Sequence, residues 1–186
     1  MTRPLTAALA ATALAGAMLA APAVSATTLL GTFMHDYGSD PGKVNPSGND
    51  VLFPDFVRVS DQSTGRFSDV LSFAGLAYDQ ITSLVLTLNF AGAGPSGCIG
   101  AFCFGEQWSV RVQGSDSSAS SDDYFAVLFD PLSPQAFTLT AATDSGSISA
   151  WANSLANESL EFWFAESTTG ADAFDLTWAK LQVYGD

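Results

Sequence analysis

The sequence predicts an all-β protein, an antiparallel two-sheet sandwich of jelly-roll type with one short helix over residues 147–156. Apolar and polar residues alternate in several short segments, which is the period of a half-buried strand. Joints rich in Gly, Pro, Asp and Ser separate these segments. The length fits one domain over residues 27–186, after a leader over residues 1–26.

Residues 1–26 have the pattern of a signal peptide. Arg3 supplies a positive charge, an uncharged apolar run extends from Leu5 to Ala21, and Val24-Ser25-Ala26 resembles a cleavage site. We therefore expect an exported protein, which is secreted, periplasmic or held at the cell surface. We expect no membrane span in the mature chain.

The clearest strand covers residues 84–90, where every second residue is Leu or Phe and the residues between them are mostly polar. Two further segments alternate in the same way, Trp108–Val112 and Phe137–Leu139. The remaining expected strands are Leu29–Met34, Phe53–Val59, Phe67–Phe73, Tyr124–Phe129, Leu160–Ala165 and Phe174–Tyr184.

The parity of the apolar residues changes within the last expected strand. Phe174, Leu176 and Trp178 share one parity, whereas Leu181 and Val183 have the other. Because a strand alternates strictly between its two faces, both sets point inward only if an extra residue is inserted. The sequence therefore predicts a β-bulge near Ala179 and Lys180.

A helical spacing occurs once, between the strands that end at Leu139 and begin at Leu160. Ile148, Trp151, Ala152 and Leu155 follow one another at the spacing of a helix face, after the capping residues Asp144-Ser145. We expect this helix to lie across a sheet or to close one end of it.

The charge balance excludes one class of partner. The chain has 19 acidic and 6 basic residues, a net charge of −13. Such a surface repels phosphate backbones, so we expect no nucleic acid to bind. The 14 phenylalanines are enough to fill a core, which argues against intrinsic disorder.

Two cysteines, Cys98 and Cys103, lie close together in the sequence. In an oxidising compartment an isolated close pair usually forms a disulfide. Closing so short a loop restricts the unfolded chain only modestly. The predicted disulfide therefore constrains one loop and contributes little to the stability of the whole fold.

Six segments of the second half share a loose apolar pattern: Glu106–Val110, Phe137–Leu139, Ser154–Asn157, Leu160–Phe162, Asp172–Leu176 and Leu181–Gly185. Together they resemble the exported β-sandwich domains of bacterial PEP-CTERM-type surface proteins. The resemblance covers roughly residues 81–185 and implies a sandwich fold. It implies no chemistry, because most members have no known function. The chain carries no C-terminal Pro-Glu-Pro motif, so we expect no anchoring by that route.

No catalytic constellation emerges from the sequence. A nucleophilic triad has to use His35, the single histidine, and no G-x-S-x-G elbow is present. A glycosidase needs two carboxylates across a cleft, but Glu161 and Glu166 have opposite parity on one expected strand. We expect a non-catalytic module, with a polysaccharide-acting hydrolase as the alternative.

Calcium is the metal that the sequence favours. The segment from Asp36 through Asp40 to Asp50 is rich in side-chain oxygens and in turn-forming residues, which suit a hard cation. Asp172 and Asp175 flank the start of the last expected strand and extend this candidate set, because the first and last strands of a sandwich are often close. No EF-hand loop is present.

A carbohydrate site needs exposed aromatic rings beside polar groups. Trp163 is the first candidate, because Phe162 and Phe164 have the opposite parity; Tyr37 and Tyr184 are lesser candidates. The alternative is that the helix covers this face and Trp151 packs on Trp163. The sequence thus favours an exported module that binds polysaccharide or a calcium-bridged matrix, with a passive coat or matrix subunit as a third possibility.

Overall fold

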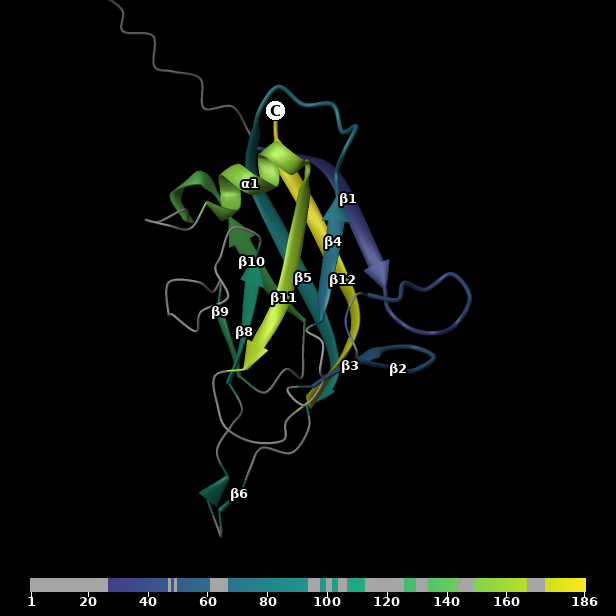
Figure 1. Ribbon diagram of the computed structural model, residues 1–186. Coiled ribbons are helices and arrows are strands. Elements are labelled where there is room, and N and C mark those ends of the chain that lie inside the picture. The colour runs from purple at the N-terminus through teal and green to yellow at the C-terminus, as the bar shows by residue number, and fades with distance from the viewer. Residues whose placement is uncertain are drawn as a thin grey trace, which may run out of the picture.

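The protein is an all-β sandwich of two antiparallel sheets, which confirms the predicted fold class (Figure 1). The computed structural model describes residues 27–46, 48, 50–60, 67–93, 98–99, 102–103, 107–112, 126–129, 134–143, 149–166 and 173–186. The expected leader lies outside these residues, so it stays a prediction. Within the described part of the chain, no helix has the length and apolar character needed to cross a membrane.

The larger sheet is built around one long strand, β12. Its order is β10-β5-β12-β3-β2, and β1 also pairs with β12, on the same edge as β3 but further along the strand. The strands are β1 (Thr28–Asp36), β2 (Val51–Leu52), β3 (Val57–Ser60), β5 (Ile81–Ala93), β10 (Gln135–Leu139) and β12 (Ala173–Gly185).

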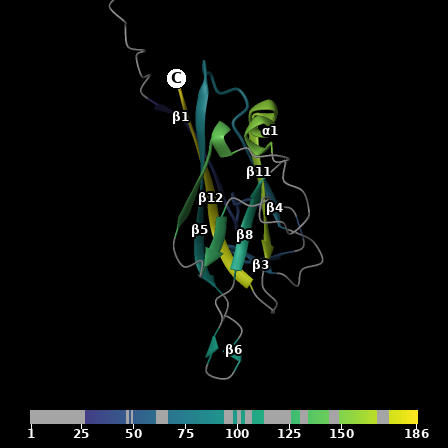
Figure 2. The same cartoon turned by 90° about the vertical axis from the view of Figure 1, so that its left-hand side faces the viewer.

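The smaller sheet has the order β4-β11-β8-β9 and faces the larger one as a second layer (Figure 2). Its strands are β4 (Ser68–Ser72), β8 (Gln107–Val112), β9 (Ala126–Phe129) and β11 (Ser159–Glu166). A separate two-stranded ribbon, β6 (Cys98–Ile99) and β7 (Phe102–Cys103), was not predicted from the sequence.

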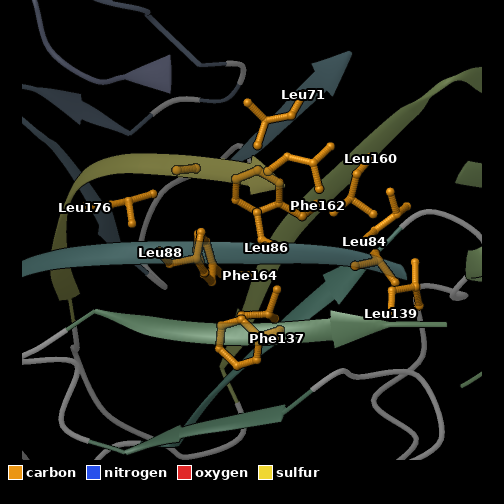
Figure 3. Packing of buried hydrophobic residues seen from close by; sticks show 14 of the residues in the cluster. Leu71, Leu84, Leu86, Leu88, Phe137, Leu139, Leu160, Phe162, Phe164 and Leu176 are labelled. Carbon is orange, nitrogen blue, oxygen red and sulfur yellow. The ribbon is translucent and has the colours of Figure 1, made fainter. Parts of the chain in front are cut away.

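The core lies between the two sheets and follows the predicted alternation. Leu84, Leu86 and Leu88 of β5 are fully buried, and they face Phe162 and Phe164 of β11 across the layer (Figure 3). The ring centroid of Phe164 lies 4.8 Å from that of Phe174, in an edge-to-face arrangement. These apolar side chains bring strands from both halves of the chain into one core.

The predicted bulge is present in β12, but it lies at Thr177 and Trp178, two residues before the expected position. The register against β5 shifts between Leu176 and Trp178. Leu176 and Ala179 are both buried, so the change of face occurs between them. Trp178 was expected in the core, and instead it lies half-buried on the outer face, because the small Ala179 takes the inward position.

The expected strand Phe53–Val59 is interrupted. Pro54 lacks a backbone N–H, and the N–H of Phe53 instead donates to the carbonyl of Phe56 at 2.9 Å, which closes a turn between β2 and β3. The two phenylalanine rings stack at 4.5 Å in this turn. Only Val57 and the residues after it continue as strand.

The helix α1 (Ala150–Asn157) closes one end of the sandwich, next to β11 (Figure 1). It begins later than predicted, after Ser149, and the expected caps Asp144 and Ser145 lie outside the described residues. Trp151 and Leu155 pack against the core as expected. Ala152 is exposed, and Ala150 and Ser154 are buried in its place, so the buried stripe is rotated from the predicted one.

Candidate functional site

The outer face of the larger sheet carries a row of four side chains on β12: Trp178, Lys180, Gln182 and Tyr184. Strand alternation brings them to the same face, because Ala179, Leu181 and Val183 point into the core. All four side chains of the row are partly exposed. The two aromatic rings stand at the ends of the row, roughly 20 Å apart along the strand.

The strands on either side of β12 widen this row into a broader surface. On β1, Leu29 lies opposite Tyr184, and Met34 lies opposite Lys180. These two side chains are 47% and 48% exposed, which is unusual for residues of their size in a folded sheet. On β5, Thr87 lies opposite Lys180. The surface therefore combines apolar and aromatic area with hydroxyl, amide and ammonium groups.

Lys180 also interacts with the aromatic end of the row. Its Nζ lies 5.7 Å from the centre of the Trp178 ring, a cation–π contact. The long apolar stem of the lysine covers part of the neighbouring surface. Trp178 is thereby oriented on the sheet face.

A second polar constellation lies at the edge between the two sheets. His35 Nδ1–H donates a hydrogen bond to Asp69 Oδ2 at 2.8 Å, and the Tyr37 hydroxyl donates to the same oxygen at 2.5 Å. His35 lies in β1 and Tyr37 directly follows the end of that strand, whereas Asp69 lies in β4 of the other sheet. The cluster therefore connects the two sheets with side-chain hydrogen bonds.

Burial determines the electrostatics of this cluster. Tyr37 is fully buried and Asp69 is 9% exposed, whereas the His35 side chain is 30% exposed. Burial raises the pKa of Tyr37 well above its usual value, and the negative charge of Asp69 and the hydrogen bond to it raise it further. Tyr37 is thus held as a neutral donor to the carboxylate.

The three predicted carbohydrate-binding residues lie in different surroundings. Tyr37 is fully buried, so a sugar cannot stack on its ring. Tyr184 lies on the outer face described above. Trp163 points to the outer face of the smaller sheet, opposite Arg111 of β8. Trp163 is only half-buried, but its indole N–H is buried and has no hydrogen-bond partner among the described residues.

The alternative for Trp163 was that the helix covers it. Trp151 and Leu155 of α1 pack against the core cluster, and the core residues of β11 lie on the opposite face of that strand from Trp163. The helix therefore closes the end of the sandwich.

The predicted calcium ligands are partly engaged in other contacts. Asp175 accepts two hydrogen bonds from Arg58, at 2.7 and 2.8 Å. The Asp50 Oδ1 atom accepts the backbone N–H of Ser60 at 3.3 Å, and Asp36 and Asp40 are exposed. Asp172 lies outside the described residues. In the part of the chain that the structure describes, no three His, Cys, Asp or Glu side chains gather closely enough to hold a metal.

Arg58 and Asp175 form part of a small structural cluster. The guanidinium carbon lies 5.0 Å from the Phe53 ring centre and 5.7 Å from that of Phe56. The hydrogen bond to Asp175 raises the pKa of Arg58. This bidentate ion pair joins β12 to β3, so the Asp175 carboxylate has a structural role.

The alternative catalytic pair is not brought together among the described side chains. Glu161 lies opposite Val70 of β4, on the outer face of the smaller sheet. The backbone of Glu166 ends β11 opposite Trp108, and its side chain is outside the described part.

A shallow depression of about 700 Å³ lies at the end of the sandwich near α1 and the end of β12. Its apolar part includes Leu30 and Leu76, and Tyr78 stands at its rim with 36% of its area exposed. The remaining lining residues are Ala77, Asp79, Glu158 and Asp186.

Comparison with protein-family models and with curated protein sequences gave no match. The likeness to exported surface-protein domains therefore stays an expectation from the sequence.

Two features of these sites were missed in the sequence, although signals for them exist. Asp69 shares its parity with Phe67, Leu71 and Phe73, so alternation alone marks it as an inward-pointing carboxylate. The outward position of Trp178 was missed because the bulge was placed two residues too late.

Proposed function

We propose that this chain is an exported, non-catalytic β-sandwich module that binds a neutral, extended polysaccharide on the outer face of its larger sheet. The observation that carries the proposal is the outward row on β12, with Trp178 at one end and Tyr184 at the other. Lys180 and Gln182 lie between the two rings.

The chemistry of sugars suits this face. A sugar ring has an apolar face of C–H groups, which stacks on aromatic rings, and an edge of hydroxyl groups, which needs hydrogen-bond partners. The row offers both, and Thr32 and Thr87 add hydroxyl groups beside Gln182 and Lys180. An open sheet face with its aromatic rings spaced along one strand suits an extended chain better than a compact ligand.

The charge of the protein favours a neutral polysaccharide over an acidic one. The net charge is −13, and Lys180 is the single cation in the row. An anionic polymer that approaches such a protein meets long-range repulsion, which weakens association at low salt. A neutral glycan meets no such barrier.

One observation favours a second function, that of a self-associating coat or matrix subunit. Leu29 and Met34 expose almost half of their area on the same face. Thr32 lies between them on this face. Apolar side chains exposed on one sheet face can mark a contact between proteins. Sedimentation of the purified protein over a range of concentrations distinguishes the two, because the glycan-binding module stays monomeric without its ligand.

Affinity electrophoresis in gels containing a soluble neutral β-glucan, xylan or galactomannan tests the proposal. We expect one of these polymers to retard the protein, and Trp178→Ala and Tyr184→Ala each to weaken retardation about tenfold through lost stacking. Tyr78→Ala is the matched control, because Tyr78 is exposed but lies in the depression at the end of the sandwich. Retardation by none of the polymers, or equal retardation of all variants, contradicts the proposal.

The same gels separate two further possibilities. If Trp163→Ala alone abolishes retardation, the glycan binds on the smaller sheet. If EDTA abolishes it and calcium restores it, glycan binding depends on calcium, and Asp36→Asn, Asp40→Asn and Asp50→Asn then test the predicted ligands one by one.

A further inference from the structure

The two aromatic rings of the outer row are separated by one regular stretch of strand. The register of β12 against β5 continues without a shift from Trp178 to Tyr184. A strand advances by about 3.3 Å per residue, so the two positions are roughly 20 Å apart. Along this stretch β12 is paired with β1 on one side and with β5 on the other, which keeps the separation of the two rings constant.

The strands beside β12 carry no aromatic residue at the outward positions that the structure describes next to the row. On this face a ligand therefore finds stacking partners along β12 and none across the neighbouring strands. A ligand that stacks on both rings has to lie parallel to β12. The neighbouring outward positions are Leu29, Thr32, Met34 and Asp36 on β1, and Ser83, Val85, Thr87 and Asn89 on β5.

We propose that this face takes a stretch of at least about five sugars along β12, with one sugar stacked on Trp178 and another on Tyr184. The bound length and direction rest on the proposed function, because both assume that a glycan is the ligand. Each sugar of an extended polysaccharide advances by about 5 Å, so about four steps separate two sugars that lie over rings roughly 20 Å apart. A disaccharide or trisaccharide reaches only one ring.

The two rings act as two linked contacts for one chain. Once a sugar is stacked on Trp178, a chain that is long enough brings another sugar to Tyr184 without a second loss of translational freedom. The sugars between them lie over Lys180 and Gln182, whose ammonium and amide groups donate hydrogen bonds to hydroxyl oxygens. Affinity should therefore rise in a step when the chain first reaches the second ring, and not by an equal amount with each added sugar.

Isothermal titration calorimetry with cello-, xylo- and manno-oligosaccharides of two to six sugars tests the bound length. We expect the affinity of the wild type for one series to rise about tenfold between the trisaccharide and the hexasaccharide, from the second stacked ring. In Trp178→Ala and in Tyr184→Ala, which each keep one ring, this step should disappear. Tyr78→Ala is the matched control and should keep the step, because Tyr78 lies in the depression at the end of the sandwich.

Calorimetry and the polymer gels together distinguish failure of the bound length from failure of the proposed function. If a polymer retards the protein but the trisaccharide and the hexasaccharide bind equally, or the step persists in either single-ring variant, the bound length is wrong and glycan binding stands. Retardation by a polymer without binding of any hexasaccharide also contradicts the bound length. If no polymer retards the protein and no oligosaccharide binds, both are wrong.

Discussion

The backbone N–H of Tyr37 donates a hydrogen bond to the carbonyl of Thr177 at 2.8 Å, which joins the end of β1 to the bulge in β12. Thr177 is held from its other side, because its hydroxyl donates to the carbonyl of Asn89 at 3.0 Å and accepts the Asn89 amide at 2.6 Å. The bulge thus turns Trp178 outward while Tyr37 is directed inward to Asp69. The bulge in β12 therefore positions Trp178 in the outer row and Tyr37 in the cluster with His35 and Asp69.

Replacing Thr177 by Val should test this bulge. The substitution keeps the shape of the side chain but leaves the Asn89 amide without its acceptor. We expect the free energy of unfolding to fall by about 1–2 kcal/mol in urea unfolding. Thr138→Val on the exposed face of β10 is the control and should change it by less than about 0.5 kcal/mol. Equal effects of the two substitutions would show that the hydroxyl of Thr177 is unimportant.

Tyr37→Phe removes the hydroxyl that donates to the buried carboxylate of Asp69. Hydrogen bonds to charged groups contribute about 1.5–3 kcal/mol, and a buried acceptor that loses its donor is costly. We expect the free energy of unfolding at pH 7 to fall by about 2 kcal/mol. Tyr78→Phe, at an exposed position, should be neutral to within about 0.5 kcal/mol. A neutral Tyr37→Phe variant would contradict the role of this bond.

The raised pKa of Tyr37 also predicts a dependence of stability on alkaline pH. The unfolded tyrosine ionises near pH 10, whereas burial and Asp69 hold the folded side chain neutral. The stabilisation is therefore complete below pH 10 and is lost as pH rises towards the folded pKa, at about 1.4 kcal/mol per pH unit. In denaturant unfolding between pH 9 and 11, Tyr37→Phe should remove this slope. A slope that persists in that variant must arise from another group.

Gly38 and Gly42 should differ sharply in their tolerance of alanine. Both have positive φ, +151° and +89°, which disfavours a side chain. A Cβ on Gly38 would also lie 2.1 Å from the carbonyl oxygen of Pro54, whereas nothing lies within 4 Å of one on Gly42. We expect Gly42→Ala to cost about 1 kcal/mol and Gly38→Ala at least about 3 kcal/mol in thermal or urea unfolding. Similar costs would mean that the loop moves freely away from Pro54.

The register of the ribbon places the two cysteines of the predicted disulfide opposite each other. Cys98 lies directly opposite Cys103, and Ile99 lies opposite Phe102 with two residues between them in the sequence. In a hairpin with a two-residue loop, the second pair from the loop has its Cα atoms about 4.5 Å apart, within the range that a disulfide bridges.

Treatment with a reductant that would break the predicted disulfide should leave the sandwich folded. The closed loop is short, so we expect the free energy of unfolding to fall by no more than about 2 kcal/mol. Figure 1 draws β6 apart from the two sheets, which agrees with a local role. Circular dichroism and thermal unfolding with and without reductant measure the effect, with the Cys98→Ser, Cys103→Ser double variant as control. Loss of the β spectrum on reduction would contradict the prediction.

Much of the fold was predictable because strand periodicity is local. The alternation of Leu84, Leu86 and Leu88 placed β5 in the core, and the parity change after Leu176 required a bulge. Its location was not predictable, because either Trp178 or Ala179 could fill the inward position. The choice depends on the space left between the two sheets, which sequence spacing does not report.

The amino-acid sequence alone determined that this chain forms short alternating strands around an apolar core, with one helix near residue 150. The tertiary structure decided which strands pair, and so it brought His35 and Tyr37 to Asp69 and turned Trp178 to the surface beside Lys180. The physical reason is that burial preference repeats within a strand, whereas partners over 30 residues apart are selected by the packing of the whole core.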